Sequence, residues 1–301
     1  MIPMARRPRA AVALAVLAAV LGLPAGAATD APAASTPANR SARPALTADQ
    51  IVARSMEAHG GMEAWRRLEG TFWKGRLESE RLPQHSARFE ITEKRPNRQR
   101  FEILDPAQKS LRVFDGTRGW VLRAGADGRP NLQQFSDAEI RYAREAPGLE
   151  GPIVDFAIKG RPFELVGRET VEGTDCYRLG VRLGTGETQT VWVDTKTFLE
   201  VRYDRVTYGD DGPRGIISAY YRDFRVVEGL ALPSVVEIGA QGGTKRDRML
   251  IDQVALNPKI PDSAFGRPPG VPQSHEVVVR PMAPGVAGAH PPRAEPPATP
   301  K

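Results

Sequence analysis

The sequence predicts an α+β fold in which an antiparallel sheet dominates and a few helices pack on one side of it. The first observation is an alternation of apolar and polar residues with period two, as around Phe101 and Ile103, which is typical of a strand with one wet face. The second is Asp115-Gly116, which separates two such runs and favours a β-hairpin because glycine tolerates the positive φ of tight turns. Runs of this kind recur along the chain, so we expect a long antiparallel meander.

Helices are expected at two capping boxes, where a Thr or Ser side chain and a residue three positions later satisfy each other's backbone N–H groups. Thr47 with Gln50 opens the first, and Ser136 with Glu139 opens the second. Shorter helical segments are expected at 62–68 and 152–159. The first helix closes at His59, where the helix dipole favours a cation.

The strands have apolar residues on one face. Trp73 and Leu77 share a face of the first strand, and Phe89 and Ile91 share a face of the next. Pro96 ends that second strand because it cannot donate a ladder hydrogen bond. Further strands are expected at 163–171, 176–183, 188–194, 198–208, 215–227, 230–238 and 248–256.

The chain ends differ in composition from the middle. Residues 1–28 carry an arginine-rich start, a short apolar run and small residues, the pattern of a cleaved signal peptide that leads to the periplasm or outside the cell. No cysteine lies near the expected cleavage point, so we expect no lipid anchor at the mature N-terminus. Residues 29–46 are expected to form a flexible spacer, 47–270 the folded domain, and 271–301 a disordered proline-rich tail.

Charge and cysteine content narrow the classes of function. The formal net charge is +6. Without the three arginines of the leader it is about +3, too small to argue for nucleic acid. The single cysteine, Cys176, lies in a strand pattern and is expected to be a buried thiol without a disulfide partner.

No catalytic or cofactor motif stands out. The four histidines are dispersed without metal-ligand spacing, and no nucleophile elbow, Walker loop or dinucleotide fingerprint occurs. We therefore expect a protein that is not an enzyme and that needs neither a metal nor another cofactor.

Several short motifs together resemble the periplasmic lipoprotein-carrier (LolA/LolB-like) superfamily, which includes outer-membrane lipoprotein-sorting proteins. Lys94-Arg95-Pro96-Asn97 followed by Asp115-Gly116-Thr117 is similar to that family's strand end and hairpin. Residues 191–197 resemble its W-x-D hairpin, and residues 261–271 resemble its C-terminal strand. The resemblance implies a strongly curved antiparallel sheet, a half-barrel, with helices covering the concave face.

The resemblance further implies an apolar cavity that holds a lipid, an acyl chain or a lipoprotein. Its expected lining is Trp73, Phe89, Ile91, Phe101 and Trp120, although each of these residues could equally fill the core. We expect a monomer, with an envelope protein as a possible partner. The alternative on the same fold is a periplasmic regulator, a sensor or a protein-interaction module.

Arg95 has two interpretations. By resemblance it lies at the cavity rim, where its donors hold the carbonyl ends of the helices and gate the cavity. Alternatively it is a solvated surface arginine that pairs with an acid such as Glu93.

Overall fold

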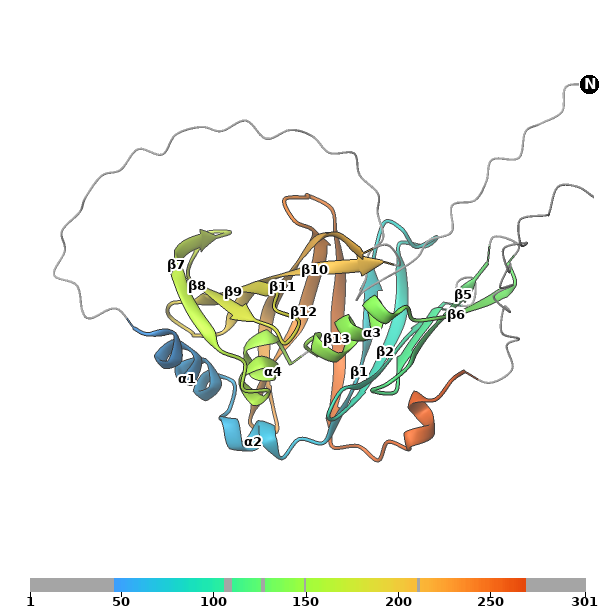
Figure 1. Ribbon diagram of the computed structural model, residues 1–301, viewed down its shortest axis with the longest axis horizontal. Helices are drawn as coiled ribbons and strands as arrows, with labels where there is room; N and C mark the ends of the chain where they lie inside the picture. The colour runs from blue at the N-terminus through green and yellow to red at the C-terminus, as the bar shows by residue number, and fades with distance from the viewer. Residues whose placement is uncertain (1–45, 106–109, 126–127, 149, 210–211, 269–301) are drawn as a thin grey trace, which may run out of the picture.

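The computed structural model describes residues 46–105, 110–125, 128–148, 150–209 and 212–268 (Figure 1). The predicted signal peptide and tail, and the spacer except for its last residue, lie outside these ranges. None of the helices in the described part of the chain is long and apolar enough to cross a membrane.

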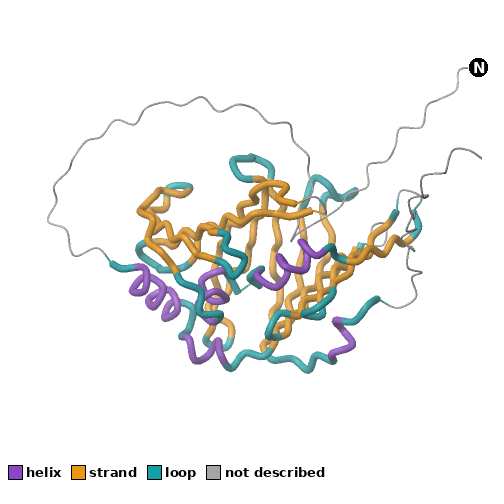
Figure 2. Tube along the Cα trace, viewed as in Figure 1, coloured by secondary structure: helices purple, strands orange, loops and turns teal. Residues whose placement is uncertain are grey.

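All thirteen strands of the described chain belong to one antiparallel sheet with the order β6-β5-β4-β3-β2-β1-β13-β12-β11-β10-β9-β8-β7. The sheet is open, with β6 and β7 at its edges, and it curves around the helices (Figure 2). The predicted α+β class, mostly β, is confirmed. The elements are α1 (Ala48–Ala58), α2 (Met62–Arg66), β1 (Gly70–Glu78), β2 (Ser86–Lys94), β3 (Arg98–Leu104), β4 (Ser110–Phe114), β5 (Gly119–Ala124), β6 (Pro130–Gln134), α3 (Asp137–Glu145), α4 (Pro152–Ile158), β7 (Phe163–Val171), β8 (Thr174–Arg182), β9 (Thr188–Asp194), β10 (Glu200–Gly209), β11 (Gly212–Val227), β12 (Leu230–Ala240), β13 (Arg246–Leu256) and the 3-10 turn η1 (Asp262–Phe265).

The predicted helix starts are confirmed. The capping boxes of Thr47 with Gln50 and of Ser136 with Glu139 are both formed, at the starts of α1 and α3. Pro152 occupies the first turn of α4, where its missing N–H costs nothing.

Two segments differ from the sequence prediction. Strand β6 is not predicted, because its five residues between two loops show no clear alternation. The C-terminal strand expected within 261–271 is wrong for the described residues, which form η1 instead. Pro261 and Pro268 interrupt strand pairing there, and Phe265 is buried against the convex face of β4 to β6.

The main core lies on the concave face of the sheet, between the strands and three of the helices. Ile51 and Met56 of α1, Trp65 of α2, and Ile153 and Phe156 of α4 all belong to it. At about 25 cal/mol per Å² of buried apolar area, this packing is the main source of stability for short helices that would not form alone.

A buried polar contact fixes these helices to the sheet. His59, at the end of α1, lies with Nε2 2.5 Å from Glu200 Oε2 and with Nδ1 3.1 Å from the Ala231 carbonyl oxygen. Glu200 Oε1 accepts the Ile153 N–H at 3.1 Å, and Trp65 Nε1 donates to the His59 carbonyl oxygen at 2.9 Å. The contact therefore joins α1, α2, α4, β10 and β12.

The pair is shielded from water, since the His59 and Glu200 side chains are 0% and 1% exposed. Burial alone would lower the pKa of His59, but the charge and hydrogen bond of Glu200 outweigh it and raise the pKa above the ordinary value. Gly151 leaves room for the pair, because a Cβ there would lie 2.9 Å from Glu200 Oε1.

Replacing Glu200 by alanine is expected to lower the free energy of unfolding by about 3–5 kcal/mol, because it leaves a buried imidazole without its partner. Glu57→Ala, at an exposed position of α1, is the control and should change stability by no more than about 0.5 kcal/mol. Urea unfolding followed by circular dichroism measures both. A loss below about 1 kcal/mol for Glu200→Ala would contradict the tethering role.

Candidate functional site

The strand register brings most of the predicted cavity residues together. Trp73 pairs with Ile91, and Ile91 pairs with Phe101, so the three form a row across β1, β2 and β3 on the concave face. Phe89 lies two residues before Ile91 on β2, so its side chain is on the same face. Its ring centroid is 6.2 Å from that of Phe101. All four side chains are at most 3% exposed and belong to the main core.

Trp120 is not part of this row. It pairs with Val113, which pairs with Arg100, and these residues point to the convex face. There Trp120 packs in a second cluster with Leu111, Leu132 and Phe265. The structure therefore places four of the five predicted lining residues on one face and the fifth on the other.

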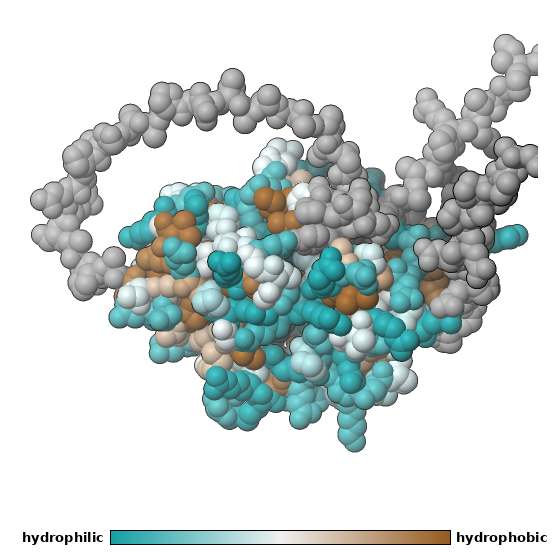
Figure 3. All heavy atoms as spheres, in the orientation of Figure 1, coloured by the Kyte–Doolittle hydropathy of each residue, from teal (hydrophilic) through white to brown (hydrophobic). Residues whose placement is uncertain are grey.

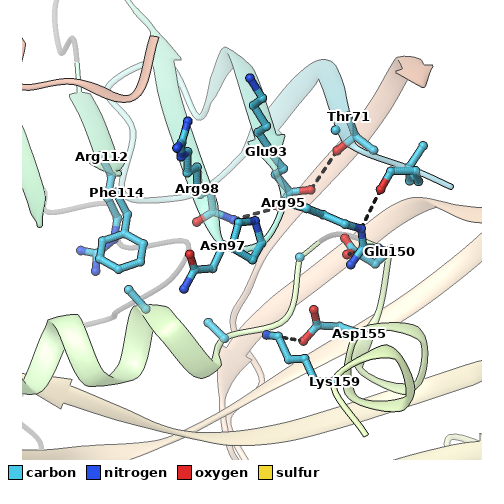
Figure 4. Close-up of a pocket in the computed structure, with 18 of the residues that line it drawn as sticks. Thr71, Glu93, Arg95, Asn97, Arg98, Arg112, Phe114, Glu150, Asp155 and Lys159 are labelled. Carbon is cyan, nitrogen blue, oxygen red and sulfur yellow. Dashed lines mark hydrogen bonds and ion pairs between the residues drawn. The ribbon is translucent and has the colours of Figure 1, made fainter. Parts of the chain in front are cut away.

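A cavity of about 70 Å³ lies between the concave face and the helices. Its walls come from the hairpin tip between β2 and β3, from α3 and the connection after it, and from α4 (Figure 4). Ligand pockets usually measure about 300–1,000 Å³, so this cavity is small. The predicted lining residues Trp73, Phe89, Ile91, Phe101 and Trp120 are not among the residues that line it. The described surface seen in Figure 3 mixes hydrophilic and apolar residues.

Arg95 fastens the hairpin tip to the helical side. Its Nε donates to the Leu68 carbonyl oxygen at 2.8 Å, just beyond the end of α2, and its backbone N–H donates to the Glu69 carbonyl oxygen. Its Nη2 lies 3.9 Å from Glu150 Oε1, in the connection between α3 and α4 (Figure 4). Arg95 thus contacts segments at two sides of the cavity.

Three acids lie close together at this cavity. Glu93 Oε1 would lie 2.9 Å from a Cβ placed on Gly148, and the same Cβ would overlap the Glu150 carboxylate, so both carboxylates approach one glycine. Asp155 is paired with Lys159 at 2.7 Å. Burial raises the pKa of Glu150 to about 8, and the charges of Glu93 and Asp155 act in the same direction.

Helix α3 covers the cavity through polar and aromatic contacts. Tyr142 is its one buried residue, and no α3 side chain belongs to the main core as described. The guanidinium of Arg205 lies 5.2 Å from the Tyr142 ring centroid, and Arg112 Nη1 lies 3.7 Å from Glu139 Oε1. Glu145 accepts from Arg161 at 2.7 Å.

Sequence reasoning missed several of these residues. Arg112 alternates with Leu111 and Val113, and the pattern predicts that the apolar pair faces the main core. The register shows the reverse, since Leu111 and Val113 face the convex cluster and Arg112 faces the cavity. Glu150, Glu200 and Arg205 carry no sequence signal, because their partners lie far away along the chain.

Metal binding and thiol chemistry find little support in the described residues. They contain no group of three or more His, Cys, Asp or Glu side chains placed to hold a metal ion. Cys176 is a buried free thiol as predicted, and burial raises its pKa to about 11, so it is a poor nucleophile.

No family model and no curated protein matches the chain. Solved structures do match. A LolA superfamily protein from Nitrosomonas europaea has a TM-score of 0.47 and 15% identity, over 74% of this chain and 99% of that chain. A DUF1329 family protein from Desulfovibrio piger has a TM-score of 0.45 and 13% identity, over 72% of this chain and 96% of that chain.

A domain from Vibrio parahaemolyticus, named for outer membrane lipoprotein sorting, has a TM-score of 0.43 and 12% identity, over 71% of this chain and 94% of that chain. The matches thus include the superfamily that the sequence motifs resemble. At these identities they concern the fold, and function has to be argued from the residues of this chain.

Replacing Glu150 by glutamine should change how stability depends on pH. A carboxyl group whose pKa rises from 4.5 unfolded to about 8 folded binds its proton more tightly when folded, so stability falls as pH rises between these values. Glutamine has no charge to bury and should remove this loss. Between pH 5.5 and 8.5 the wild type should lose at least about 1 kcal/mol more than Glu150→Gln, the equivalent of one pKa unit.

Urea unfolding at the two pH values measures the difference, and any contribution of His59 is common to both proteins. Glu164→Gln, at an exposed position on β7, is the matched control and should follow the wild type. Parallel pH profiles for wild type and Glu150→Gln would contradict a raised pKa at this site.

Proposed function

We propose that this protein is a non-catalytic periplasmic carrier or binding protein that holds a lipid or acyl chain, free or as part of a lipoprotein, in a cavity on the concave face of its sheet. The observation that carries the proposal is the contrast between the floor and the cover of that face. The floor is a row of apolar core side chains, Trp73, Ile91 and Phe101, which lies beside the present cavity, whereas α3, which lines that cavity, adds no side chain to the described core.

The chain topology supports a separable cover. β6 and β7 follow each other in sequence but form the two opposite edges of the sheet. The connection between them, which carries α3 and α4, therefore has to cross the open side of the curved sheet (Figure 1). Such a crossing can move without breaking any strand pairing.

The two helices of this connection are held differently. Ile153, Val154 and Phe156 of α4 are fully buried in the core, and α4 is tied to Glu200. Helix α3 has only Tyr142 buried, and it is joined to the sheet by the Arg112–Glu139 ion pair and the Arg205–Tyr142 cation–π contact. Opening α3 lets water hydrate both partners of the ion pair, whereas moving α4 would expose apolar side chains, so α3 is the part that opens.

Energetics support binding after opening. Each buried methylene contributes about 0.8 kcal/mol, so about ten methylenes contribute about 8 kcal/mol. That free energy corresponds to a micromolar dissociation constant. The closed cavity of about 70 Å³ is too small for such a chain, so binding and opening are coupled.

Arg95 is the proposed latch. Its hydrogen bond to the Leu68 carbonyl oxygen and its 3.9 Å contact with Glu150 connect the hairpin tip with both sides of the cover. A latch that is present only in the closed form lowers the population of the open form and slows the release of a bound chain, since release requires opening.

We expect saturable binding of a dansyl-labelled fatty acid with a dissociation constant in the micromolar range, about 8 kcal/mol of binding free energy. Fluorescence titration measures it, and an unlabelled fatty acid should displace the probe. Absence of saturable binding by the folded protein would contradict the carrier. A stable peptide partner with an empty cavity would instead favour the regulator.

Arg95→Leu should release the bound probe several-fold faster, because the latch to Leu68 and Glu150 is lost in the closed form. Arg88→Leu is the matched control on the same strand pair, since Arg88 is at an exposed position of β2 and does not line the cavity. Stopped-flow dissociation measures both rates, and thermal unfolding checks that the fold survives. Equal release rates for Arg95→Leu and wild type would show that Arg95 does not hold the cover closed.

A further inference from the structure

Two buried arginines reach the covered side of the sheet from strands that lie far apart in it. Arg112 comes from β4 and has a side chain 14% exposed, and Arg205 comes from β10 and is 5% exposed. Arg112 pairs with Phe101 across β3 and β4, so its guanidinium starts beside the apolar floor. Burying two cations is costly unless something offsets their charge.

Both guanidinium groups contact the cover. Arg112 lies 3.9 Å from the Phe135 ring centroid, just before α3, and 3.7 Å from the carboxylate oxygen of Glu139 on α3. Arg205 lies over the Tyr142 ring of the same helix. Burial lowers the pKa of Arg112 and of Arg205 to about 10, and the charge of Arg112 lowers that of Arg205 further.

Each arginine also borders a space. Arg112 and Tyr142 line the cavity beneath α3. Arg205 lines a second hollow of about 330 Å³, where the pairing of β9 with β10 stops after Thr190 and Asp204. Trp192, which also lines this hollow, packs in a cluster separate from the main core, whereas its neighbours Val191 and Val193 belong to the core, so the hollow lies on the convex side of the sheet. Arg205 reaches the covered side through its contact with Tyr142.

We propose that Arg112 and Arg205 form the binding site for the anionic headgroup of a single-chain amphiphile, and that Glu139 and the rings of Phe135 and Tyr142 take its place while α3 is closed. This inference rests on the proposed carrier function and specifies its ligand class. A carboxylate or phosphate fits because a guanidinium offers donors in a planar fork and no acceptor.

The arrangement also explains why the headgroup and the chain would bind together. When α3 leaves, Arg112 loses Glu139 and both arginines lose their aromatic contacts with the cover, so both guanidinium groups become accessible from the opened space. An anion there supplies charge-assisted hydrogen bonds to both. The floor residue Phe101, which pairs with Arg112, is next to that position, so the acyl chain can follow the row towards Ile91 and Trp73.

The test compares a dansyl-labelled fatty acid with its methyl ester, which has the same chain and no charge. The wild type should bind the acid at least tenfold more tightly than the ester. Arg112→Gln and Arg205→Gln should each remove most of this preference without weakening the binding of the ester. Arg225→Gln, at an exposed position of β11, is the control and should keep the wild-type preference.

Glu139→Gln supplies an independent variant that keeps the fold, because glutamine preserves the capping box with Ser136. It removes the carboxylate that competes for Arg112, which the acid has to displace and the ester does not, so affinity for the acid should rise several-fold more than affinity for the ester. This result decides the question even if the two arginine variants unfold.

The other outcomes separate the two proposals. Equal wild-type affinity for acid and ester, or an equal loss of both probes in folded arginine variants, would overturn the headgroup site and leave the carrier intact. Displacement of the acid by inorganic phosphate at low concentration would overturn it in favour of a site for free anions. Binding of neither probe by the wild type would refute the carrier itself.

Discussion

The buried pair of His59 and Glu200 determines where the helices lie on the sheet. The two ring nitrogens and the two carboxylate oxygens are shared among α1, the start of α4, β10 and β12, elements that come from three distant parts of the chain. Apolar packing alone has little directional preference, so it would permit these short helices to slide across the concave face. The polar contact has one geometry, and it holds α1 and α4 as a fixed frame. The proposed opening of α3 requires that α1 and α4 stay in place on the sheet.

The concave face of the sheet carries both apolar and charged side chains. The row of Trp73, Ile91 and Phe101 is apolar, whereas Arg112 and Arg205 bring charge to the space beneath α3. A protein that only needed a stable core would gain from apolar residues at these two positions, because buried charges seldom add net stability. Their presence beneath a helix that is held by an ion pair is consistent with the proposed exchange of α3 for a bound ligand.

The sequence was sufficient to predict the class of fold, because its signals are local. The capping boxes at Thr47 and Ser136 and the hairpin at Asp115-Gly116 depend on residues a few positions apart. The site is less predictable, since Glu200 lies 141 residues from His59 and nothing near either residue points to the other. Trp120 and Arg112 show a further limit. The alternation of residue types shows which residues share a face of the sheet. Because both faces carry apolar clusters, it does not show which face is concave.

The order of strands also has a consequence for how the chain is made. β1 to β6 and β7 to β13 are two meanders of sequence neighbours, and β1 joins them only by pairing with β13. During synthesis from the N-terminus, the outer edge of β1 therefore stays unpaired until β13, the last strand of the sheet, has been made. Such an edge is a template for pairing with another chain. The newly made protein is thus most prone to aggregation in the interval before β13 is available, and a truncation that removes β13 would make that interval permanent.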